Sequence, residues 1–243
     1  MKPLLRWIGL CVIAFVALQL FFVARIALML AVHPESTTFQ RSEAWRLTRA
    51  HGELRWRQQW VPYARISDNL KRAVIASEDD DFVNHDGVEW EAIEKAWQKN
   101  AKAEELAAQR ARQARPGKKP LKIVGGSTIS QQLAKNLFLS GERTLLRKGQ
   151  EFVLTMLLEN ILGKRRILEI YLNNVEWGEG VFGAEAAAEH YYRKPASRLS
   201  ANEAARLAVM LPRPKYFERV PNSGYLSSRA STIVGRMRDA ELP

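Results

Sequence analysis

The sequence predicts a mainly α-helical protein that begins with a single membrane-spanning helix. The first observation is an almost wholly apolar run from Leu4 to Val32. The second is that, from Ser67 onward, nearly every segment spaces its apolar residues as a helix does, between recognisable capping residues. The third is that alternating strand patterns are scarce. A chain of 243 residues accommodates one such domain and an appendage.

The N-terminal apolar run has the length and flanks of a membrane anchor. Trp7 to Ala24 is eighteen residues without a charge, about the minimum for crossing a bilayer. Lys2 and Arg6 precede the run, which predicts a cytoplasmic N-terminus and a translocated remainder. The alternative is a cleaved signal peptide, but the run is long for one and residues 31–34 are a poor cleavage site. We therefore expect residues 1–34 to form a cytoplasmic stub and an uncleaved anchor.

Composition restricts the chemistry of the remaining chain. The single cysteine, Cys11, lies in the anchor, so the rest of the chain has no cysteine for a disulfide or a metal site. The net charge of +11 is concentrated in residues 95–122, where nine Lys and Arg face two Glu. A solvated helix and loop, or attraction to anionic lipid headgroups, explains such a segment. We do not expect nucleic acid as a partner.

The segments after the anchor fall into two parts. Residues 35–66 form a linker or entry segment with a short strand near Leu54–Arg57, and residues 67–243 form the folded domain with a basic insertion at about 98–122. Gly163 is predicted to end one helix as a left-handed C-terminal residue. Helices are expected at Ser67–Glu78, after Gly87, at Ser130–Leu139, Leu145–Leu162, Arg165–Asn173 and 184–192, and from Ser200 to Pro212.

A glycine pair and a hydroxyl pair open one of these helices, within Gly125–Asn136. Thr128 and Gln131 have the spacing of a capping box, and Gln131 shares a helix face with Lys135. The free N–H groups and the positive dipole end of a helix attract anions. The stretch is therefore a candidate cradle for a phosphate-bearing ligand, or simply a helix cap after a flexible turn.

Four consecutive acids, Glu78 to Asp81, are the strongest candidates for acid–base chemistry. Crowded carboxylates at a helix C-terminus repel, which raises the pKa of one of them. A carboxylate with a raised pKa suits a general base acting on a sugar hydroxyl, although a hydrated acidic turn or a cation site has the same pattern. His85 follows in the turn, where a hydrogen-bonding structural role is the usual one. No second histidine lies at a zinc-site spacing.

A second charged group combines Arg143, Arg147 and Lys148 with Glu151. Arg147 and Glu151 are four residues apart and share a helix face, as Arg143 and Arg147 do if the helix begins early enough. Like charges on one face are unfavourable unless an anion lies nearby, so the group is a candidate phosphate site. A surface ion pair between Arg147 and Glu151 is the alternative.

Four motifs occur in an order that resembles the peptidoglycan glycosyltransferases, glycosyltransferase family 51. They are Glu78-Asp79-x-x-Phe82-x-x-His85-x-Gly87, Gly125-Gly126-Ser127-Thr128-Ile129-x-Gln131-Gln132-Leu133-x-Lys135-Asn136, Arg147-Lys148-x-x-Glu151 and Ile167-Leu168-Glu169-x-Tyr171-Leu172-Asn173. The resemblance covers about residues 65–215. Ser130 and Glu89 depart from it, standing where threonine and aspartate are commoner.

The resemblance implies a lysozyme-like glycosyltransferase domain of the monofunctional, membrane-anchored form, which polymerises lipid II into glycan strands. Glu78 would deprotonate the acceptor's C4 hydroxyl, and undecaprenyl pyrophosphate would leave with inversion. Glu151 would be the second carboxylate, while Lys135 and Arg143 would balance the charge of the leaving group. The wider expected sets are the substrate- and pyrophosphate-binding residues Gly126, Ser127, Thr128, Gln131, Gln132, Lys135, Asn136, Arg143, Arg147 and Lys148, and the supporting residues Asp79, Phe82, His85 and Gly87.

The same resemblance implies the surroundings of the enzyme. Its partners would be lipid II, the lipid-linked glycan strand, membrane lipids and other cell-wall synthesis proteins, at the outer face of the bacterial inner membrane. No cofactor is required, and a divalent cation, Mg²⁺ or Mn²⁺, would suit the pyrophosphate. Two alternatives remain: a lysozyme-like enzyme that cleaves glycans and a non-catalytic, anchored basic protein that binds lipid. A hydrolase has no need of cations for pyrophosphate, so Lys135 and Arg143 favour the transferase.

Overall fold

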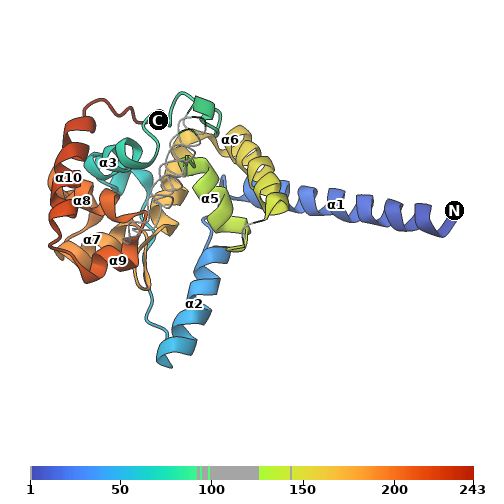
Figure 1. Cartoon of the computed structure of the whole chain (residues 1–243), viewed down its shortest axis with the longest axis horizontal. Helices are drawn as coiled ribbons and strands as arrows, with labels where there is room; N and C mark the ends of the chain where they lie inside the picture. Colours follow the sequence, from blue (N-terminus) through green and yellow to red (C-terminus); the bar gives the residue numbers. More distant parts are fainter. Residues whose placement is uncertain (1, 92–93, 95–97, 99–125, 143) are drawn as a thin grey trace, which may run out of the picture.

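A long N-terminal helix extends from a helical body in the computed structural model of the protein (Figure 1), which describes residues 2–91, 94, 98, 126–142 and 144–243. The helices are α1 (Lys2–Leu28), α2 (Thr38–His51), α3 (Asp68–Glu78), α5 (Ile129–Phe138), α6 (Leu145–Asn174), α7 (Ala184–Tyr192), α8 (Ala201–Met210), α9 (Pro214–Arg219) and α10 (Gly224–Arg236), with 3₁₀ turns at Tyr63–Arg65 and Ala196–Arg198. The predicted mainly helical fold is confirmed.

Within the described residues, the strands form one small sheet. It contains β1 (Arg57–Gln58), β2 (Glu176–Gly178) and β3 (Val181–Phe182) in the order β1-β3-β2. β1 is parallel to β3, and β2 is antiparallel to it. The short strand predicted near Leu54–Arg57 therefore exists, but it begins at Arg57, where the predicted strand ends.

Local signals placed most helix ends correctly. Thr128 forms the predicted capping box with Gln131. Ser200, where a helix was predicted to begin, forms another with Glu203. Gly163 adopts φ 72° and ψ 161° and interrupts α6, so the predicted division into two helices is confirmed. Most of the helix expected after Gly87, and the basic segment 99–122, lie outside the described residues.

Helix α2 was not predicted, because residues 35–66 were interpreted as a linker. Thr37 and Gln40 form a capping box at its start, and Gly52 ends it in the left-handed conformation. The helix is joined to the body near its N-terminus, where Thr38 Oγ1 donates to the carbonyl of Leu137 over 2.9 Å. Its composition is strongly polar, so the apolar spacing that identified the other helices is weak in this one.

The core lies between α3, α8 and α10 on one side and α5 and α6 on the other. Leu70 and Val74 of α3 and Leu133 of α5 are completely or almost completely buried. The second half of α6 is central, since Ile167, Leu168, Ile170, Tyr171 and Leu172 are all at most 1 % exposed. A helical segment with so many fully buried side chains is a rigid support for the elements packed on it.

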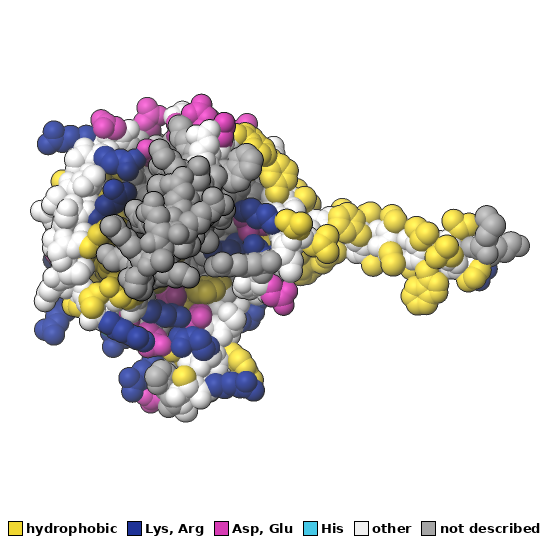
Figure 2. All heavy atoms as spheres, viewed as in Figure 1, with side chains coloured by type: hydrophobic (Ala, Val, Ile, Leu, Met, Phe, Trp, Pro, Cys, Tyr) yellow, Lys and Arg dark blue, Asp and Glu magenta, His cyan; other side chains and the backbone are white. Residues whose placement is uncertain are grey.

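Helix α1 is long and apolar enough over Pro3–Leu28 to cross a membrane, consistent with an anchor. Figure 2 shows its hydrophobic side chains standing clear of the body. Its last turns pack on the body instead: the amides of Gln19 and Gln150 exchange two hydrogen bonds of 3.2 Å, and Ile26 is fully buried. Arg166 of α6 donates to the carbonyl of Met29 over 2.8 Å. The C-terminal part of α1 is therefore held on the body at several positions along its length.

We predict that Gly163→Ala lowers the free energy of unfolding by about 1–3 kcal/mol, because φ 72° with ψ 161° is accessible only to glycine. Thermal unfolding in detergent would measure the change. Gly235→Ala is the matched control, since Gly235 lies in α10 with no atom within 4 Å of an added Cβ and no positive φ. Equal melting temperatures for the two variants would contradict the prediction.

Candidate active site

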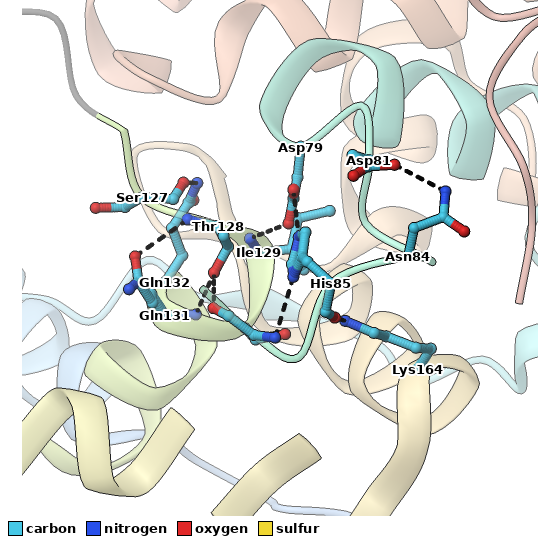
Figure 3. A network of polar contacts seen from close by, with 12 residues as sticks. Asp79, Asp81, Asn84, His85, Ser127, Thr128, Ile129, Gln131, Gln132 and Lys164 are labelled. Carbon is cyan, nitrogen blue, oxygen red and sulfur yellow. Dashed lines mark hydrogen bonds and ion pairs between the residues drawn. The ribbon is translucent and has the colours of Figure 1, made fainter. Parts of the chain in front are cut away.

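Three segments meet at the candidate active site: the C-terminal end of α3, the turn that follows it, and the N-terminal end of α5. Figure 3 shows Asp79 of the first segment, His85 of the second and Ile129 of the third close together. Glu78 ends α3, so the candidate base lies at the edge of this junction. The first two predicted motifs are therefore adjacent in space, although about fifty residues separate them in the chain.

Asp79 joins these segments through its two carboxylate oxygens. Oδ1 is 2.8 Å from Nε2 of His85, and Oδ2 accepts from the backbone N–H of Ile129 over 2.9 Å. The side chain is fully buried. A carboxylate at a helix N-terminus satisfies an otherwise unpaired donor and complements the dipole. Asp79 is therefore the connection that fixes α5 against the end of α3.

The hydrogen bonds of His85 define its tautomer. Its Nδ1 accepts from the backbone N–H of Gly87 over 3.0 Å, so the ring proton lies on Nε2 and is donated to Asp79. His85 thus holds the turn together and orients Asp79. This agrees with the structural role expected for a lone histidine in this turn.

Gly87 is at a position that a larger residue cannot occupy. Its φ is 84°, and an added Cβ would lie 2.7 Å from Cγ2 of Thr155 and 2.8 Å from Cγ of Glu159. Its carbonyl accepts from Oγ1 of Thr128 over 2.6 Å. The turn therefore presses directly on α6 and is bonded to the cap of α5.

The N-terminus of α5 is already occupied by groups of the protein itself. Thr128 and Gln131 bond reciprocally at 3.2 Å and 3.3 Å, and both side chains are buried. The N–H of Ile129 is taken by Asp79. An anion cradle built from these N–H groups, one of the two interpretations of the sequence, has little left to offer a ligand. Gln131 belongs to the cap in this structure.

Gln132, the next residue, points to the candidate base. Its Nε2 donates to Oε2 of Glu78 over 3.1 Å, and its Oε1 accepts from the hydroxyl of Tyr171 over 2.9 Å. Because Tyr171 is buried and its hydroxyl donates, the amide is held with its NH₂ toward Glu78. Ser77 makes a longer contact of 3.4 Å to the other carboxylate oxygen.

The surroundings of Glu78 raise its pKa above the ordinary value. Burial is the main cause, and the negative charge of Asp79 adds to it. The hydrogen bonds from Gln132 and Ser77 act in the opposite direction, because they favour the ionised form. The same kind of environment raises the pKa of Tyr171 well above its usual value, so its hydroxyl stays protonated as a donor.

The third predicted motif forms a compact charged group on the first half of α6. Arg147 Nη1 is 2.7 Å from Oε2 of Glu151, and Lys148 contacts the other oxygen. Glu151 is buried, whereas about half of the Lys148 side chain is exposed. The predicted pair of Arg147 and Glu151 is present, and both oxygens of Glu151 are engaged by cations. Arg143 lies outside the described residues.

A second, partly buried network supports the turn and was missed by sequence reasoning. Glu159 of α6 accepts from Oγ of Ser130 over 2.5 Å and pairs with Lys164 over 2.8 Å. Lys164 also donates to the carbonyl of His85 and lies 4.6 Å above the ring of Phe82. The available signal was an acid on an otherwise apolar helix, since a buried carboxylate requires partners.

The remaining predicted ligands lie along the exposed edge of α5 and before it. Ser127 and Lys135 are exposed, while Gly126 and Asn136 are partly exposed. Ser127 also accepts a 3.4 Å bond from Gln132 through its carbonyl. These residues are placed where they could meet a ligand from solvent, unlike Thr128 and Gln131.

The comparisons with known proteins agree with this arrangement. The family model described as transglycosylase matches residues 47–238, and the chain belongs to this family. Among its relatives, a biosynthetic peptidoglycan transglycosylase of Burkholderia thailandensis is 53 % identical over 242 residues, covering 98 % of this chain and 88 % of the relative. One of Bordetella pertussis is 56 % identical over 210 residues, covering 86 % and 82 %. The resemblance found in the motifs is confirmed, and the matched region is longer than residues 65–215.

We predict that Asp79→Asn destabilises the fold by about 1–3 kcal/mol, because the amide can accept from only one of the two buried donors, His85 or Ile129. Thermal or chemical unfolding would measure the loss. Asp81→Asn is the control, since the Asp81 side chain is exposed and bonded only to exposed Asn84 among the described contacts. A loss of similar size in both variants would argue against the bridging role of Asp79.

Proposed function

We propose that the protein is a peptidoglycan glycan-strand polymerase. In this proposal it transfers the growing lipid-linked glycan onto the C4 hydroxyl of lipid II, with inversion, and releases undecaprenyl pyrophosphate. The observation that carries the proposal is the placement of Glu78, whose pKa is raised by burial and whose carboxylate is oriented by Gln132. Membership of the transglycosylase family supports the same reaction.

Glu78 would act as the general base. Its raised pKa brings its proton affinity closer to that required at neutral pH. Gln132 occupies one carboxylate oxygen at 3.1 Å, whereas within the described part of the chain the other oxygen has only the long contact to Ser77. The proton of the C4 hydroxyl would pass to this second oxygen. The C4 oxygen would then attack the anomeric carbon as the bond to pyrophosphate breaks.

The charged group on α6 would stabilise the departing pyrophosphate. Preorganised cations that face a developing charge are a large contribution to catalysis. Glu151 engages Arg147 and Lys148 through separate oxygens, which would hold both cations in place. Its proposed role is therefore to orient these cations. Lys135 and Arg143 remain the further proposed partners of the leaving group.

A divalent cation is not assigned to a protein site. Among the described residues, no group of three or more His, Cys, Asp or Glu side chains is arranged to hold a metal ion. The donor set therefore does not fit a resident Mg²⁺ or Mn²⁺, and we derive no step through one. An ion that accompanies the pyrophosphate would belong to the substrate.

The proposed location follows from the anchor. Helix α1 would cross the bacterial cytoplasmic membrane with Lys2 and Arg6 inside, which would place the catalytic domain at the outer face. Lipid II, the lipid-linked strand and membrane lipids are the proposed partners at that face. Association with other cell-wall synthesis proteins is proposed on the resemblance alone.

We predict that Glu78→Gln abolishes most polymerisation of lipid II, by about a hundred- to ten-thousand-fold, because the amide cannot accept the proton. Gel analysis of glycan products and release of undecaprenyl pyrophosphate would measure it. Asp81→Asn, with an exposed side chain, should retain activity. An unchanged rate for Glu78→Gln would refute the proposed base, and digestion of finished peptidoglycan without polymerisation would support the hydrolase instead.

We predict that Tyr171→Phe moves the acidic limb of the pH–rate profile to higher pH, by up to about 1 unit. Without the hydroxyl, the Gln132 amide is free to turn its oxygen toward Glu78, which removes a bond that favours the carboxylate. A higher pKa of the base means that activity is lost at a higher pH as the solution is acidified.

The matched control for this profile is Tyr192→Phe, whose hydroxyl contacts the carbonyl of Glu203 over 3.4 Å. Its pH–rate profile should coincide with that of the wild type. If the Tyr171→Phe profile also coincides, the hydroxyl has no part in orienting the base.

A further inference from the structure

The segment Leu54–Arg57, predicted as a strand from the sequence but unused by the proposed reaction, lines a cavity. This cavity has a volume of about 800 Å³ and lies among the end of α2, the segment leading into β1, β3, α7 and α9. None of its lining residues takes part in the site around Glu78. In Figure 1, α7 and α9 lie on the side of the body opposite to the N-terminal end of α1. The cavity therefore belongs to the part of the protein remote from the anchor.

One wall of the cavity is rigid because β1 lies directly on β3. The N–H of Arg57 donates to the carbonyl of Gly180 over 2.8 Å. Gly180 has φ 71°, and an added Cβ would lie 2.1 Å from the carbonyl oxygen of Arg55, so only glycine allows this approach. Trp56 stacks on Phe182 with 4.3 Å between ring centroids. The cationic and aromatic groups of this wall are thus held on a fixed backbone, as in preformed ligand sites.

The opposite wall is built around Glu218, whose carboxylate is already satisfied. Oε1 is 3.0 Å from Nε2 of His190, and Oε2 accepts from the N–H of Glu179 over 2.8 Å. Arg57 Nη1 donates to Nδ1 of His190 over 3.3 Å, which places the ring proton on Nε2, toward Glu218. Both carboxylate oxygens of Glu218 therefore have a partner, one in His190 and the other in the N–H of Glu179.

The charges that remain for a ligand are positive. The other acid of the lining, Glu179, pairs with Arg46 of α2 over 3.0 Å. Three arginines line the cavity against these two engaged acids: Arg55, Arg57 and Arg219. Arg55 pairs with Glu53 over 2.6 Å, which leaves Arg57 and Arg219 as the cations for a ligand. Arg57 and Arg219 are exposed. Guanidinium groups bind carboxylates in pairs of hydrogen bonds, and the neighbouring Leu54 and Trp56 supply apolar surface.

We propose that this cavity binds a carboxylate-bearing peptide, with the carboxylate on Arg57 and Arg219 and the apolar part against Trp56. The inference rests on the proposed function, which supplies such a peptide: the nascent glycan strand carries short peptides with free carboxylates. A phosphate would also suit arginine, but the phosphates of lipid headgroups and of the strand lie at the membrane, away from this side of the body. The cavity would hold a peptide of the strand after it leaves the catalytic site.

The test measures binding of short, soluble, uncross-linked glycan strands to the full chain in detergent. One strand sample keeps its peptides, and the other has lost them to an amidase. Wild-type protein should bind the peptide-bearing strands, and Arg57→Ala with Arg219→Ala should weaken this binding at least about tenfold. Arg229→Ala, which removes an exposed arginine of α10, is the matched control and should bind as the wild type does. Higher salt should weaken the wild-type binding, because exposed charges are screened.

Equal binding of the stripped and the peptide-bearing strands would overturn the proposal, and so would unchanged binding by the double variant. Circular dichroism and thermal unfolding establish whether the double variant is folded. If it is not, the single variant Arg219→Ala replaces it, since the Arg219 side chain is exposed at the surface. The strands contain no lipid pyrophosphate, so the binding result does not depend on turnover. Polymerisation of lipid II by the same preparations reports separately on the proposed function, which makes the two failures distinguishable.

Discussion

The arrangement of the site depends on one carboxylate that serves two donors. Asp79 binds His85 in the adjoining turn and the first N–H of α5, and these partners come from motifs about fifty residues apart. Through this connection, Gln132 of α5 reaches Glu78 at the end of α3. The carboxylate of Glu78, the proposed base, makes only two side-chain contacts among those described, so its position depends on its neighbour in the chain.

Buried polar groups, rather than apolar packing alone, define the geometry around Glu78. Asp79, Glu151 and Glu159 are each held by two partners. Asp79 and Glu159 connect separate segments of the site, whereas Glu151 fixes two cations of its own helix. Such networks are costly when a single partner is lost, and they specify one arrangement when all partners are present. Gly87 also helps to define this geometry, because the absence of a side chain allows the turn to contact α6 directly.

Sequence reasoning succeeded where the signal was local. Caps such as Thr128 with Gln131, the interruption at Gly163 and the apolar N-terminal helix all follow from neighbouring residues. It could not distinguish the roles of Gln131 and Gln132, because only the packing of α5 determines which amide closes the cap and which faces Glu78. The contacts of Glu159 with Lys164 and Ser130 could not be predicted either, because the contact with Ser130 depends on how α5 packs on α6. Helix α2 was overlooked because a polar helix lacks apolar spacing.

Because α1 is docked on the body, the anchor would also set the distance between the site and the membrane. Gln19 meets Gln150, and Arg166 holds the carbonyl of Met29, so the helix and the body form one piece through the last turns of α1. With α1 in a bilayer, as proposed, the height of Glu78 above the membrane is set by a rigid helix that rises 1.5 Å per residue. A flexible tether would let the domain sample many heights. Here a change in bilayer thickness would tilt or shift the whole enzyme relative to its lipid-linked substrate.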